Sequence, residues 1–169
     1  MKADKISLEY AKPEKLFYFV ANVVIWRATD GRCLILKRSE TEAVHPGKYC
    51  VPGGKLEWRD LPLMHPTRMN GDVVDFERVA EDLLRREVRE EAGISIGDEL
   101  RYLNSVAFVR PDGIPVVLVK FAARYLSGMV SLESGSFVDH AWVNVEEVAK
   151  YNCILGIPEE IKTTIELFK

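Results

Sequence analysis

Residues 86–94 (REVREEAGI) constrain what this chain can fold into more strongly than any other stretch. Apolar residues recur at helical spacing before them, Asp75 is a plausible N-cap, and Gly93 stands where a left-handed C-terminal residue is expected. The pattern therefore predicts a helix over residues 76–92. Its apolar stripe consists of Val79, Ala80, Leu83, Leu84 and Val88.

Three glutamates fall on the side of this helix that should face the interior. At about 100° per residue, Glu87 and Glu91 lie near the azimuth of Ala80 and Leu84, with Glu90 beside them. Like charges at this spacing repel, carboxylates in the last turns oppose the helix dipole, and burial raises their pKa. A divalent cation would reverse all three effects. The spacing alone leaves a metal site and a solvated acidic face as equal alternatives. The opposite face already carries Arg78, Asp82, Arg85 and Arg89.

Composition places the chain among ordinary soluble globular proteins. Its 169 residues, 47% hydrophobic and 29% charged, suit one domain with a substantial core. The net charge of −3 gives no electrostatic reason to expect a nucleic-acid partner. No signal-like segment or membrane-length apolar run is present, and the three cysteines form no C-x-x-C pair. We therefore expect a cytoplasmic protein that does not enter a membrane.

Runs of β-branched and aromatic residues predict two antiparallel hairpins. One covers residues 17–37 around a turn at Asp30-Gly31, and the other covers residues 101–125 around a turn at residues 110–113. Because these hairpins alternate with helices, they indicate an α+β layered domain. The further predicted elements are a short strand at 49–51, a strand at 137–143, a short helix at 145–151 capped by Asn144, and a last helix that opens at Pro158.

Residues 58–75 interrupt this order. They hold Pro62, Pro66 and Asn70-Gly71 and show little periodicity, so we expect a long inserted loop.

On these residues the chain resembles the Nudix family, whose box reads G-x5-E-x7-R-E-U-x-E-E-x-G-U, where U is a bulky apolar residue. Residues 86–94 match its second half at every fixed position, and Pro52-Gly53-Gly54 resembles its entry. The resemblance extends over about residues 17–148. It implies a single Nudix domain over residues 1–169, folded as an α/β/α sandwich with a mixed β-sheet flanked by helices.

The chain departs from the box between its two halves. From Gly54 to Arg86 there are 32 positions where the box expects 14, so 18 residues are extra. Counting back from Arg86 places Arg78 at the first glutamate of the box, with Glu77 one step away. The first box acid is therefore left unassigned.

The resemblance implies roles for individual residues. Glu87, Glu90 and Glu91, with the backbone carbonyl of Gly53, match the metal-binding positions, and Arg86 matches an arginine that holds the acids in place. Oxygen ligands of this kind suit Mg²⁺ or Mn²⁺.

The general base and the substrate contacts are less defined. The box acids Glu87 and Glu90 are candidates for the base, as are Glu133 and Asp139 from later in the chain. Arg38 is a candidate for binding phosphate, and Trp58 for stacking on a base.

The implied function is Mg²⁺-dependent hydrolysis of the diphosphate bond in a nucleoside diphosphate derivative: a nucleotide sugar, an ADP-ribose-like compound or a nucleoside triphosphate. One alternative is a Nudix-like module that binds a nucleotide without cleaving it. Another is an isomerase of isoprenoid diphosphates on the same fold, which would need Cys50 as a catalytic residue. A homodimer is a further possibility.

Overall fold

Strand β1 (Tyr18–Arg27) is the centre of a mixed sheet, and its neighbours run in both directions. It is parallel to β9 and antiparallel to β2 and β4. The computed structural model describes residues 5–169. The other strands of the sheet are β2 (Arg32–Arg38), β3 (Tyr49–Cys50), β4 (Gly53–Lys55), β7 (Ser95–Ile96), β8 (Arg101–Val109), β9 (Pro115–Ser127) and β10 (Phe137–Val143).

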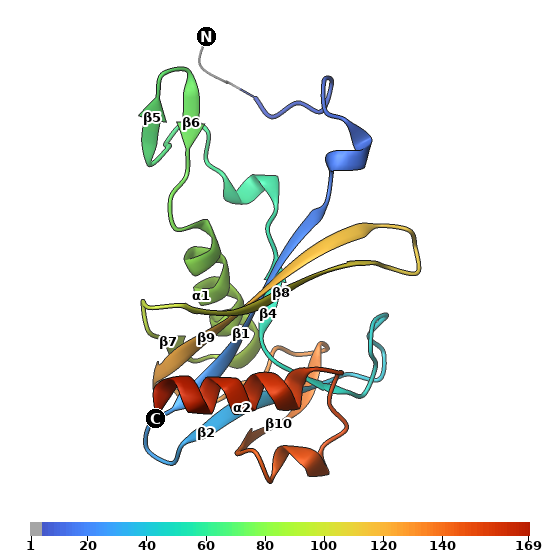
Figure 1. Ribbon diagram of the computed structural model, residues 1–169, viewed down its shortest axis with the longest axis vertical. Helices are drawn as coiled ribbons and strands as arrows, with labels where there is room; N and C mark the ends of the chain where they lie inside the picture. The colour runs from blue at the N-terminus through green and yellow to red at the C-terminus, as the bar shows by residue number, and fades with distance from the viewer. Residues whose placement is uncertain (1–4) are drawn as a thin grey trace.

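One α-helix covers each face of the sheet (Figure 1), which confirms the predicted sandwich. Successive side chains of a strand point to opposite faces, so β1 supplies both cores. Val23 and Ile25 pack in the cluster under α1 (Val79–Ala92), and Val24 and Trp26 in the cluster under α2 (Ile157–Phe168). Among the described residues, no helix is long and apolar enough to cross a membrane.

The two predicted hairpins form as expected, but the start of the first helix was predicted wrongly. Helix α1 begins at Val79, not at residue 76, and Asp75 does not cap it. Asp75 belongs instead to strand β6 and accepts hydrogen bonds from Arg68. Arg78 precedes the helix in a left-handed conformation, with φ of 61°, and breaks the helical path there.

The inserted segment is more ordered than the predicted loop. It contains a 3-10 turn (Trp58–Asp60) and a small hairpin of β5 (Arg68–Asn70) and β6 (Val73–Asp75). Gly71 adopts φ of 60° in the tight turn of this hairpin, where a side chain would be strained. The hairpin stands away from the main sheet in Figure 1. Strands of three residues are too short to show a period in the sequence.

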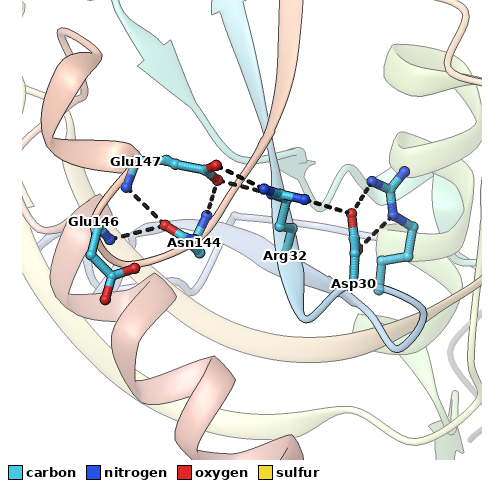
Figure 2. A network of polar contacts seen from close by, with 6 residues as sticks. Asp30, Arg32, Asn144, Glu146 and Glu147 are labelled. Atoms are coloured by element: carbon cyan, nitrogen blue, oxygen red, sulfur yellow. Dashed lines mark hydrogen bonds and ion pairs between the residues drawn. The ribbon is translucent and has the colours of Figure 1, made fainter.

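The short helix predicted at residues 145–151 is only a 3-10 turn (Val148–Lys150). Asn144 nevertheless behaves as a cap, since its side chain accepts hydrogen bonds from the backbone N–H groups of Glu146 and Glu147. Figure 2 shows how Glu147 then reaches Arg32. A further 3-10 turn (Pro13–Lys15) precedes β1.

This network ties the β1–β2 turn to the segment after β10. Arg32 donates two hydrogen bonds to Glu147, of 2.9 and 2.8 Å, and contacts Asp30 at 3.4 Å. Asp30 also accepts two bonds from Arg27, whose guanidinium lies 3.9 Å from the ring centre of Trp142. Arg27, Arg32, Trp142 and Glu147 border a cleft of about 330 Å³. The charges lining it are largely compensated within the chain.

Because Arg32 and Glu147 form an ion pair, the stability of the fold should depend on pH in the acid range. Hydrogen bonds from Arg32 lower the pKa of Glu147 from 4.5 to about 2. A depressed folded-state pKa contributes stability above 4.5 that is lost as the pH falls toward 2. Glu147→Gln should therefore lower the melting temperature at neutral pH, and the gap to wild type should close on acidification. Thermal unfolding measured across this range tests it, with Glu146→Gln as the matched control. A gap that stays constant down to pH 2 would contradict the assignment.

Candidate active site

The acidic end of α1 meets the sheet at Gly53 and Gly54, the first two residues of strand β4. The N–H of Gly53 donates a hydrogen bond of 3.0 Å to Oε2 of Glu91. A Cβ on Gly53 would lie 2.3 Å from the carbonyl oxygen of Ala21 and from Oδ1 of Asn22. Only glycine therefore fits between β1 and the helix at this position.

Gly54 makes room for the second glutamate. A Cβ there would lie 2.2 Å from Cδ of Glu87, and 2.4 and 2.5 Å from its two oxygens. The Glu87 carboxylate consequently lies directly against the backbone of β4. The two adjacent glycines set the positions of two of the three glutamates that are predicted to bind metal.

Glu91 is held in an environment that disfavours its negative charge. Burial raises its pKa to about 8, the carboxylates of Glu87 and Glu133 add to the rise, and the N–H of Gly53 and the cation of Arg38 oppose it. A buried carboxylate beside other carboxylates is an unstable arrangement unless positive charge is added or a proton is bound. A bound metal cation would supply the positive charge that this arrangement of carboxylates requires.

Arg86 braces Glu87 from the other side. Its guanidinium donates a hydrogen bond of 3.0 Å to Oε1 of Glu87 and bonds of 2.6 and 3.4 Å to the two oxygens of Asp60. Asp60 in turn accepts a bond from the N–H of Glu57. Hydrogen bonding to Arg86 is the main cause that lowers the pKa of Asp60.

Asp60 occupies the first acid position of the box, which the spacing measured back from Arg86 did not identify. It stands six positions after Gly54, where the box places its first glutamate, so the extra residues follow the box acid rather than precede it. Glu77, next to the position found by counting back, pairs with Arg68 of the small hairpin instead. Counting forward from the glycine would have found Asp60, had an aspartate been allowed in place of glutamate.

The segment after β9 brings Glu133 to the same place. The N–H of Ser131 bonds to the carbonyl of Ala92 at 2.9 Å, and the N–H of Glu133 bonds to the carbonyl of Glu91 at 3.1 Å. Asp139, the other late candidate, lies on β10 and accepts a hydrogen bond of 2.6 Å from the hydroxyl of Tyr49. The structure therefore brings Glu133, rather than Asp139, beside the helix acids.

Arg38 lies near the acids, whereas Glu90 and Trp58 are exposed. Arg38 donates to the carbonyl of Val44 at 2.8 Å and also bonds to Glu42, and its charge is felt by Glu91. Trp58 is 51% exposed on the 3-10 turn that carries Asp60. Glu90 faces solvent beside a cleft of about 390 Å³, lined also by Asp82, Arg85, Arg86 and Arg89.

The donor set suits a hard divalent cation. Carboxylate and carbonyl oxygens are the ligands that such ions prefer, and Glu91 lies where positive charge is required, as described above. Within residues 5–169, no group of three or more carboxylate, imidazole or thiol side chains is already gathered as a metal cluster. Binding would therefore require Glu90, which faces solvent, to join Glu87 and Glu91.

Comparison with known proteins identifies the family. The NUDIX domain model matches residues 18–157, so the chain belongs to the NUDIX family, whose members generally use a divalent metal. The nucleoside triphosphatase NudI of Salmonella agona is 28% identical over 133 residues, which are 73% of this chain and 80% of that protein. NudI of Escherichia coli is 26% identical over the same shares. The family and these relatives support an enzyme, a Nudix pyrophosphohydrolase.

Solved structures show the same fold. The MutT protein of Methanosarcina mazei Go1 is 22% identical with a TM-score of 0.62, covering 94% of this chain and 99% of that one. The NUDIX domain of Shewanella oneidensis NrtR, complexed with ADP ribose, is 15% identical with a TM-score of 0.67, covering 96% of each chain.

The contact between Gly54 and Glu87 predicts a selective loss of activity. In Gly54→Ala the new methyl group must displace the Glu87 carboxylate, which is the mobile end of a side chain, so the fold should survive while hydrolysis falls. Gly97→Ala is the matched control, because its nearest contact would be an unstrained 3.7 Å. Turnover and thermal unfolding of both variants check this. Wild-type turnover in Gly54→Ala would show that the position of Glu87 is unimportant.

Proposed function

We propose that the protein hydrolyses a phosphoanhydride bond of a nucleotide in the presence of Mg²⁺, with a nucleoside triphosphate as the first substrate to test. The observation that carries the proposal is the packing of Glu87 and Glu91 against Gly53 and Gly54 of β4, with Glu133 beside them. The printed activity of the NudI relatives supports the choice of a triphosphate. A nucleotide sugar or an ADP-ribose-like compound is the next choice, and the NrtR domain bound to ADP ribose supports the latter.

Each residue has a distinct part in this proposal. Glu87, Glu90 and Glu91 would hold Mg²⁺ or Mn²⁺ together with the backbone carbonyl of Gly53. The ion, when bound, would neutralise the diphosphate and lower the pKa of a bound water. Arg86 would keep Glu87 in place through the hydrogen bond between them, rather than bind substrate.

Two further contacts complete the proposed site. Glu133 would accept the proton of the attacking water, because its backbone bond to Glu91 brings it to the acids. Arg38 would contact a phosphate of the substrate, and Trp58, exposed on the turn that Asp60 anchors, would stack on the base. We place the reaction in the cytoplasm, because Cys33, Cys50 and Cys153 are all free thiols.

The isomerase alternative finds little support in the environment of Cys50. Burial raises the pKa of its thiol to about 12, and only 6% of the residue is exposed. A catalytic thiol needs the opposite, a lowered pKa and access to substrate. A purely binding module would have no need for three acids with their arginine brace.

The metal ligands give the first test of this function. Glu90→Gln and Glu91→Gln should each reduce Mg²⁺-dependent hydrolysis by about 10²-fold or more, and Glu133→Gln should do the same if it is the base. The panel should contain nucleoside triphosphates, nucleotide sugars, ADP-ribose, dinucleotides and isopentenyl diphosphate, with products identified by mass. Tight binding without turnover of any compound would favour the binding module, and wild-type rates in both glutamine variants at residues 90 and 91 would refute the metal site.

Asp60 supplies a second, independent test. Because it braces Arg86, Asp60→Asn should lower turnover by roughly 10-fold, in the range of outer-shell partners of a metal site. Asp60→Glu should retain activity, since glutamate is the residue that the box has there.

Glu77→Gln is the control for the competing alignment, and it should behave as wild type. Activity that falls in Glu77→Gln and persists in Asp60→Asn would mean that the box acid has been assigned to the wrong residue.

A further inference from the structure

The cleft on the solvent side of α1 is joined to the proposed active site by two of the residues that line it. One is Glu90, which is proposed to bind metal, and the other is Arg86, which holds Glu87. The cleft measures about 390 Å³, and its other lining residues are Asp82, Arg85 and Arg89. A substrate held at the acids would therefore have this cleft beside its phosphates.

Two of the three arginines in the cleft are already neutralised by acids of the chain. Arg85 donates a hydrogen bond of 3.1 Å to Asp82 and one of 2.6 Å to Asp98. Arg86 likewise contacts two carboxylates, at 2.6 and 3.0 Å. Because each of these guanidinium groups has two carboxylates beside it, neither offers an uncompensated charge to an incoming anion.

Arg89 carries the uncompensated positive charge of the cleft. The residue is exposed, and within residues 5–169 its guanidinium forms no hydrogen bond or ion pair. It follows Arg85 by one helical turn, a spacing at which like charges repel. An anion bound in the cleft would offset this repulsion, and a guanidinium presents the two parallel N–H groups that match a phosphate.

We propose that Arg89 binds the phosphate that lies beyond the diphosphate held at Glu87, Glu90 and Glu91, and thereby favours substrates with three or more phosphates. The inference rests on the proposed function, because that function places the diphosphate at these acids. Once Glu90 binds the metal, its charge no longer opposes an anion in the cleft. A nucleotide sugar or ADP-ribose has only two phosphates and leaves Arg89 without an anion, whereas a nucleoside triphosphate supplies one.

Binding of two inorganic anions tests the role of Arg89 without relying on hydrolysis. Titration calorimetry is run with Mg²⁺ in excess and at about 0.15 M salt, where distant charges are screened. Wild type should bind inorganic triphosphate about 5-fold more tightly than pyrophosphate, and Arg89→Gln should bind the two with nearly equal affinity. Arg85→Gln is the matched control. It should keep the wild-type preference, because it removes a charge that two acids already neutralise.

Thermal unfolding of both variants checks that a change in affinity is not a loss of folding, because a positive side chain in the last turn also favours the helix dipole. Equal affinity of wild type for the two anions would overturn the proposal. A preference for triphosphate that survives Arg89→Gln, or that Arg85→Gln abolishes to the same extent, would overturn it as well.

Turnover separates this proposal from the proposed function. In Arg89→Gln the KM for a nucleoside triphosphate should rise about 5-fold, with kcat nearly unchanged and the KM for ADP-ribose unaffected. Hydrolysis of the triphosphate with the wild-type KM would leave the function standing and overturn the role of Arg89. Absence of all turnover, with a triphosphate preference that still depends on Arg89, would refute the hydrolase and support the phosphate site.

Discussion

The close contact between the two glycines of β4, Gly53 and Gly54, and the last two turns of α1 is the interaction on which the rest of the site depends. Glu87 occupies the space where a side chain of Gly54 would be, and Glu91 is fixed by the N–H of Gly53. A helix would not ordinarily place carboxylates against a sheet, since burial and mutual repulsion both disfavour their charge. The glycines make the approach possible, and a cation would make it favourable.

The brace around this contact explains how the chain tolerates a long insertion inside its most constrained motif. The box acid, Asp60, remains bonded to Arg86, and Arg86 to Glu87, although the extra residues lie between Asp60 and α1. These residues form their own hairpin, closed by the Arg68–Asp75 pair, so they disturb the site little. A flexible loop costs only slightly more entropy as it lengthens, which is why such an insertion is affordable between two anchored ends.

The sequence allowed both large hairpins and the acidic face of α1 to be predicted, because each depends on a local period or a strong turn signal. The sandwich was implied by the resemblance to the Nudix family, whereas the residue patterns alone indicated an α+β layered domain. The left-handed Gly93 was predicted for the same reason. Three features were not readable locally. The helix starts late because Arg78 breaks it, the segment after Asn144 makes only a 3-10 turn, and the partner of Arg86 is 26 residues away. Long-range pairing of this kind leaves no period in the sequence. From the sequence, Glu133 was one of several acids that could serve as the base. Its backbone hydrogen bond to Glu91 places it beside the helix acids and distinguishes it from Asp139.

The most direct measurement is a crystal structure of the protein soaked in manganese chloride, read by anomalous scattering. The account predicts a manganese peak beside Gly53, bonded to its carbonyl oxygen and to carboxylates of Glu87, Glu90 and Glu91 at oxygen-ligand distances. A map with no anomalous peak there, and with Glu91 still bonded only to the N–H of Gly53, would contradict it.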